Sequence, residues 1–159
     1  MKRLFYLLAA AAFTACGSAT TLSVMTFNMR YDNPEDGADN WRFRRGRVAE
    51  VIASHGVDVF GTQELLANQL GDLKRLLPGY AAVGVGREDG AEAGEFSAVF
   101  YRRDRFTPLE SGTFWLSETP DVAGSQGGGG AWERSVPASC RLERVGRRLR
   151  ARGNLGRTA

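Results

Sequence analysis

Two side chains whose oxygen atoms could bind a metal ion lie at the ends of stretches of sequence that favour β-strands. Asn28 ends "LSVMTFN", and Glu64 follows "VDVFGTQ" immediately before a leucine-rich segment. A strand-to-helix junction is where an α/β protein presents side chains to a ligand. If the two strands are neighbours, both side chains emerge on one edge of the sheet. Carboxylate and amide oxygens suit a hard cation such as Mg²⁺, so Glu64 with a supporting Asn28 would make a sensible partial metal site.

Each of these residues also has a purely structural interpretation, and the spacing alone leaves both interpretations open. Asn28 could be a turn or capping residue. Glu64 could be a first-turn carboxylate that interacts with a helix dipole. The sole histidine, His55, precedes the glycine that closes a helix, and there we expect a structural role.

The periodicity of apolar residues predicts a layered α/β protein. A helix begins at Trp41 with Asn40 as its N-cap, and a second, leucine-rich helix ends before Pro78. The expected strands cover 22–31, 57–61, 80–87 and 96–103, followed by two short strands in 105–116 that break at Ser111-Gly112. This order predicts a mixed sheet with helices on one face, in the α/β (α+β) class.

The N-terminal segment has the composition of an export signal. Lys2 and Arg3 precede an apolar run from Leu4 to Ala15, and small residues follow, so we assign residues 1–19 to a signal peptide. Cleavage near Ala19 would release a periplasmic or extracellular protein. Alternatively, "FTAC" resembles a lipobox, in which case Cys16 would be acylated and the protein would be anchored to the cell envelope.

The basic charge of the chain comes from its C-terminal end. Residues 141–159 contain seven arginines and one glutamate, whereas residues 20–140 contain 12 Lys/Arg against 17 Asp/Glu. Nucleic-acid binding therefore does not follow from the pI of about 9.2. We expect residues 138–159 to form a basic, disordered or non-native tail, with nucleic-acid contact as the alternative. Cys140 is expected to be unpaired.

Several longer stretches together resemble one enzyme family. "SVMTFNMRYDNPEDGADNWRFRR" and "VIASHGVDVFGTQE", with "GEFSAVFYRRDRF", "ESGTFWLSETPD" and "WERSVP", are similar to the start of the endonuclease/exonuclease/phosphatase family. Its members are metal-dependent phosphoesterases of the DNase I type. In the family an opening strand ends in Asn, matched by Asn28, and a Gln-Glu pair, matched by Gln63-Glu64, supplies the Mg²⁺ ligand. The resemblance therefore implies that Asn28 and Glu64 are catalytic and bind Mg²⁺ or Mn²⁺. Glu95, Ser97 and Arg45 lie in matching segments.

The resemblance implies a DNase I-like four-layer sandwich, of which residues 20–137 would form roughly the first half. The family's later motifs, Asn-x-His, Gly-Asp-x-Asn and Ser-Asp-His, do not occur in this sequence. They supply the groups that polarise the phosphate and activate water. We therefore expect a truncated or frame-shifted product.

The leading interpretation is an exported, Mg²⁺-dependent phosphoric ester hydrolase by descent that has little activity as this chain alone. Its substrate would be a phosphoester, with nucleic acid, phosphoinositide and sugar phosphate left open. The alternative is a non-catalytic, surface-tethered binding or assembly fragment whose exposed sheet face favours self-association. Contact with a membrane would require the lipid anchor at Cys16.

Overall fold

The structure, a computed structural model, describes residues 21–127 and 137–145. The expected signal peptide, Cys16 and the tail beyond residue 145 lie outside the described residues. The elements in chain order are β1 (Val24–Asn28), a 3₁₀-helix η1 (Pro34–Asp39), α1 (Trp41–Ser54), β2 (Val59–Gln63), α2 (Ala67–Leu76), β3 (Tyr80–Val83), β4 (Val99–Arg102), β5 (Phe106–Thr113) and β6 (Ala138–Arg144).

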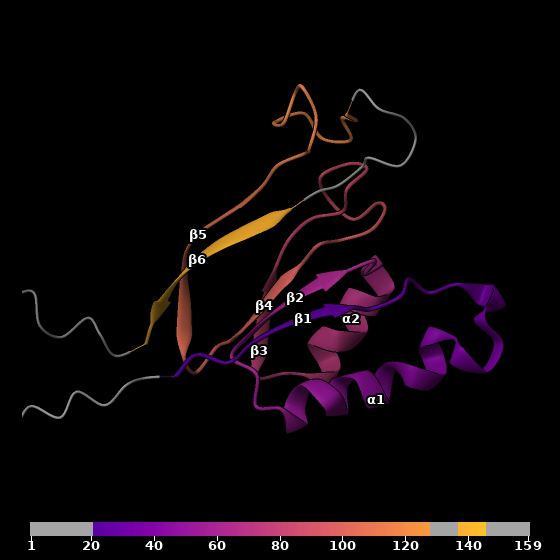
Figure 1. Ribbon diagram of the computed structural model, residues 1–159, viewed down its shortest axis with the longest axis vertical. Helices are drawn as coiled ribbons and strands as arrows, with labels where there is room; N and C mark the ends of the chain where they lie inside the picture. Colours follow the sequence, from indigo (N-terminus) through magenta and orange to yellow (C-terminus); the bar gives the residue numbers. More distant parts are fainter. Residues whose placement is uncertain (1–20, 128–136, 146–159) are drawn as a thin grey trace, which may run out of the picture.

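Four strands form a mixed sheet in the order β1-β2-β4-β3. β1 and β2 are parallel, because α1 returns the chain to the same end of the sheet, and β4 is antiparallel to both β2 and β3. Both helices lie on one side of this sheet, while β5 and β6 form a separate two-stranded sheet beside it (Figure 1). The expected α/β class, mixed sheet and helix placement are confirmed.

The core lies between the sheet and the two helices. Phe60 of β2 is fully buried and stacks on Phe100 of β4 with ring centroids 4.5 Å apart. Trp41 and Ile52 of α1 and Leu73 of α2 cover these rings and are buried to the same degree. The apolar spacing of the two helices is therefore satisfied by one shared core.

The beginning of α1 agrees with the sequence prediction. The Asn40 side chain accepts a hydrogen bond from the backbone N–H of Arg42 and so caps the helix. The indole N–H of Trp41 donates to Asp72 of α2 at 2.9 Å, and Arg45 pairs with the same carboxylate at 3.1 Å. These contacts hold the two helices together.

Two expectations about the later strands were wrong. Residues 106–113 form one continuous strand, because β6 pairs across the expected break, with Ser111 opposite Cys140 and Gly112 opposite Ser139. Residues 138–144 were assigned to the tail, yet they form β6. Pairing with β5 supplies backbone hydrogen bonds that do not depend on the composition of the side chains, so these arginine-containing residues form a strand.

No helix in the described part of the chain is long and apolar enough to cross a membrane. Cys140 is half-buried and forms no disulfide within residues 21–127 and 137–145, and burial raises the pKa of its thiol.

Candidate functional site

The parallel pairing of β1 and β2 brings Asn28 and Glu64 together. Asn28 is opposite Gln63 in the register, so β1 and β2 end together at one edge of the sheet, the edge formed by the ends of the strands. There the Asn28 Nδ2 group donates a hydrogen bond to Glu64 Oε1 at 2.8 Å. The expected convergence of these two side chains is therefore present, while their role in metal binding remains a prediction.

Glu64 occupies an irregular position between β2 and the chain that leads into β4. The Thr62 N–H donates to the Ala98 carbonyl, and Leu65 pairs with Phe96. Between these two contacts, Gln63 and Glu64 on one chain segment lie opposite the single residue Ser97 on the other. One extra residue of this kind is a β-bulge, which turns a side chain away from its regular direction. Glu64 also has a φ of 56°, in the left-handed region that non-glycine residues rarely adopt.

Arg30 has the same unusual backbone conformation, with a φ of 53°. Its N–H donates to Asn28 Oδ1 at 2.8 Å, and its carbonyl accepts from Arg44 Nη2 at 2.6 Å and from Gln69 Nε2 at 2.9 Å. Gln69 is fully buried. Asn28 thus contacts the turn at Arg30 through its oxygen and Glu64 through its nitrogen.

The Arg30 side chain forms a two-point ion pair with Asp36 of η1. Its Nε and Nη2 atoms lie 3.2 and 3.0 Å from the Asp36 carboxylate oxygens. This hydrogen bonding from Arg30 lowers the pKa of Asp36 below its ordinary value. Arg30, Asp36, Asp39 and Arg44 line a hollow of about 480 Å³ next to the sheet edge.

The other strands bring a second ion pair to the same edge. β4 begins and β3 ends there, and the loop between them pairs Arg87 Nη1 with Glu95 Oε2 at 2.9 Å. Glu95 and Ser97 therefore lie at the edge that carries Glu64, on the chain that bridges Leu65 through Phe96. Arg45, by contrast, is used in the contact between α1 and α2.

His55 lies at the opposite edge of the sheet. It caps the C-terminal end of α1, four residues before β2 begins, and its Nδ1 atom is 2.7 Å from the Val51 carbonyl oxygen. His55 therefore cannot reach the edge at which β2 ends, and a structural role accounts for its contacts.

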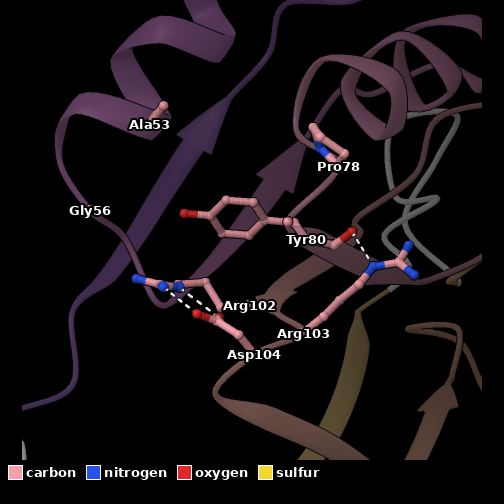
Figure 2. A pocket seen from close by; sticks show the side chains of 8 residues that line it. Ala53, Gly56, Pro78, Tyr80, Arg102, Arg103 and Asp104 are labelled. Atoms are coloured by element: carbon pink, nitrogen blue, oxygen red, sulfur yellow. Dashed lines mark hydrogen bonds and ion pairs between the residues drawn. The ribbon is translucent and has the colours of Figure 1, made fainter.

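A hollow of about 500 Å³ also lies at this opposite edge (Figure 2). Its polar groups have internal partners: the Tyr80 hydroxyl donates to Val57 O, Arg102 pairs with Asp104, and Arg103 Nε donates to Tyr80 O at 2.8 Å. These contacts serve the fold, so we do not place the functional site in this hollow.

Sequence reasoning missed Arg30, Asp36 and Gln69. The segment that contains Asp36 reads as a polar turn cluster, and Gln69 lies among helical leucines. The available signal for Arg30 was its position two residues after the candidate ligand Asn28. Its left-handed backbone and its pairing partner are properties of the folded chain alone.

The donor set at this edge fits a cation that retains most of its water ligands. The described residues contain no group of three or more His, Cys, Asp or Glu side chains placed to hold a metal ion. Mg²⁺ is commonly bound through one or two carboxylates with several waters. Glu64, steadied by Asn28, is compatible with that mode of binding.

The sequence profile described as "Endonuclease/Exonuclease/phosphatase family" matches residues 25–158, beyond the limit of residue 137 expected from the motifs. No curated protein gives a significant match.

Several solved structures are similar to this chain. An endonuclease/exonuclease/phosphatase family protein from Bacteroides thetaiotaomicron is 42% identical, with a TM-score of 0.74, over 80% of this chain and 47% of its own. One from Bacteroides vulgatus is 51% identical, with a TM-score of 0.64, over 64% of this chain and 39% of its own. A mannosyl-6-phosphatase from Bacteroides thetaiotaomicron is 50% identical, with a TM-score of 0.65, over 67% of this chain and 40% of its own.

This chain thus spans less than half the length of each of these three proteins. The profile match, the similar structures and the arrangement of Asn28 and Glu64 agree with one another. The chain belongs to the endonuclease/exonuclease/phosphatase family.

Proposed function

We propose that this chain forms the cation-binding part of a Mg²⁺- or Mn²⁺-dependent phosphoesterase. The observation that carries the proposal is the contact between Asn28 and Glu64 at the edge where two parallel strands end. A hydrogen bond with a purely structural role would not require the positive φ angles of Glu64 and of the neighbouring Arg30. Strain that the surrounding structure maintains is characteristic of functional sites.

Each residue has a definite part in this proposal. Glu64 would hold the cation through its carboxylate, and Asn28, by donating to Oε1, would fix the orientation of that carboxylate and leave Oε2 for the ion. When bound, the divalent ion supplies positive charge to offset the negative charge that grows on the phosphoryl oxygens. A hydrogen bond from a neighbouring side chain to a carboxylate that binds a metal keeps that carboxylate in the orientation that binding requires.

We further propose that the 159-residue chain alone hydrolyses phosphoesters poorly or not at all. Its single histidine lies at the other edge of the sheet, and the described residues offer no further cluster of acidic and histidine side chains near Glu64. A base that positions water and a cation that polarises the phosphoryl group are both needed for efficient transfer.

The substrate and the location of the protein are also proposals. A relative at 50% identity is a mannosyl-6-phosphatase, so sugar phosphomonoesters are the first substrates to test and nucleic acids the second. The charged, apolar and small residues in export order at the N-terminus support secretion, with lipid anchoring at Cys16 as the alternative ending.

Manganese binding tests the central proposal directly. The free Mn²⁺ signal in electron paramagnetic resonance should fall as the full chain is added, and Glu64→Gln should abolish most of that binding. Glu50→Gln removes the same charge from an exposed position on α1 and should leave binding unchanged. Equal binding by the wild type and Glu64→Gln would refute the assignment of Glu64.

Turnover tests the expected lack of activity. With Mg²⁺ present, mannose 6-phosphate and a phosphodiester reporter should both remain intact in the presence of the chain. Hydrolysis that disappears in Glu64→Gln would contradict the expected inactivity while supporting the phosphoesterase assignment.

A further inference from the structure

The Arg30 guanidinium forms its ion pair with Asp36 of η1 rather than with Glu64. Glu64 is among the charges that act on the Arg30 guanidinium, and Asn28 contacts both residues. The guanidinium nevertheless binds Asp36, through Nε and Nη2. An arginine paired with Glu64 would compete with a cation for the same oxygens.

Asp36 is well placed to keep the two groups apart. Its side chain is 15% exposed, whereas the Arg30 side chain is 51% exposed, so the carboxylate is the fixed partner and the guanidinium faces solvent. The two-point geometry fixes the plane of the guanidinium as well as its position. Within the described residues Arg30 Nη1 has no hydrogen-bond acceptor, so it remains a donor at the edge of the hollow, while the guanidinium lies over the Tyr31 ring at 4.7 Å.

The backbone of Arg30 is also fixed by several hydrogen bonds. Three hydrogen bonds, one from its N–H to Asn28 Oδ1 and two to its carbonyl from Arg44 and Gln69, keep a non-glycine residue in the left-handed region. Glycine would adopt this conformation at lower cost, which indicates that the side chain is used. The same conformation directs the Arg30 side chain toward η1.

We propose that Arg30 binds a non-bridging oxygen of the phosphoryl group next to the cation at Glu64, and that Asp36 is a positioning residue that keeps the guanidinium off Glu64. This inference rests on the proposed function, because it requires a cation at Glu64. A planar guanidinium with a free N–H donor is well suited to a phosphoryl oxygen. The alternative is that the ion pair between Arg30 and Asp36 has a structural role alone and attaches η1 to the end of β1.

Inorganic phosphate and Mn²⁺ distinguish these alternatives in the full chain. Phosphate bound next to Mn²⁺ gives a broadened ³¹P resonance, from which its affinity can be measured. Arg30→Gly keeps the left-handed backbone and should weaken phosphate binding by about tenfold, the loss expected for one charge-assisted hydrogen bond. Arg30→Lys should restore part of the affinity, and Arg47→Ala, at an exposed position on α1, should change nothing.

The role of Asp36 has a signature that a structural contact would not give. Asp36→Asn should release Arg30 toward Glu64 and weaken Mn²⁺ binding severalfold. Adding Arg30→Gly to Asp36→Asn should restore Mn²⁺ binding, since the competing guanidinium is gone. If the double variant binds Mn²⁺ as weakly as Asp36→Asn does, the positioning role is wrong.

The outcomes also separate this inference from the proposed function. Intact Mn²⁺ binding with unchanged phosphate affinity in Arg30→Gly would overturn the role of Arg30 and leave the metal site standing. Absence of Mn²⁺ binding by the wild type would overturn the proposed function. In that case the Nε–Hε resonance of Arg30 in ¹⁵N spectra decides: no shift on adding phosphate without metal would overturn the anion contact as well.

Discussion

Glu64 and Arg30 are the two non-glycine residues with positive φ in the described part of the chain, and both lie at the edge where β1 and β2 end. The left-handed region brings Cβ too close to the following carbonyl oxygen. Hydrogen bonds from Asn28 to the Glu64 side chain and from Gln69 to the Arg30 carbonyl hold these two residues in place. The candidate site therefore stores strain that the core of the domain must offset.

A pair of substitutions at Glu64 measures that strain. Both Glu64→Ala and Glu64→Gly lose the hydrogen bond from Asn28, but only alanine keeps a Cβ in the left-handed conformation. We expect Glu64→Gly to be more stable than Glu64→Ala by about 1 kcal/mol, although both lose cation binding. Urea unfolding gives the two free energies. Equal stabilities would mean that position 64 relaxes to negative φ.

At the scale of elements, Asp58 ties three strands together. It lies just before β2, is 1% exposed, accepts a hydrogen bond from the Ser23 N–H at 3.0 Å and forms an ion pair with Arg105. Ser23 precedes β1, and Arg105 precedes β5. This carboxylate therefore fixes the start of β1 beside β2, which sets the register that brings Asn28 opposite Gln63.

Removal of Asp58 should cost far more than removal of an exposed acid. Asp58→Ala leaves the Arg105 guanidinium and the Ser23 N–H without their partner, and we expect the free energy of unfolding to fall by about 3 kcal/mol. Asp104→Ala, which breaks an ion pair whose carboxylate is 62% exposed, should have a much smaller effect. Chemical denaturation compares the two. Similar losses for both variants would contradict the tie between the strands.

At the scale of the whole molecule, the two faces of the four-stranded sheet differ. α1 and α2 cover one face (Figure 1), where Phe60 and Phe100 are buried. On the other face β6 contacts β3 and β4, while Val24 of the edge strand β1 is 66% exposed. An exposed apolar edge strand is a site at which chains associate.

Self-association through β1 is therefore the expected behaviour of the purified chain. Its apparent mass in size-exclusion chromatography with light scattering should rise with concentration, and Val24→Lys should shift it toward the monomer, because a buried lysine in a paired edge is costly. Leu76→Lys, on the outer side of α2, is the matched control and should not alter the mass. A monomer at every concentration would contradict this expectation.

The sequence by itself determined the elements around the site. Local signals were enough to predict the N-cap at Asn40, the end of the second helix before Pro78 and the presence of strands in 22–31 and 57–61, because caps, breakers and apolar periods act within a few residues. The ends of these strands, at Asn28 and Gln63, differ from the expected ones by two or three residues. The grouping of Asn28 with Glu64 also followed, since strands joined by a single helix tend to be parallel neighbours.

Only the tertiary structure decided the pairing of β6 with β5, the bulge at Glu64 and the ion pair of Arg30 with Asp36. In the strand paired with β5, residues 138–142 alternate between half-buried and exposed. The conformations of Glu64 and Arg30 oppose their intrinsic preferences and depend on partners distant in the chain, such as Gln69 for Arg30. No local pattern records such contacts, because their free energy arises only after the strands and helices have packed together.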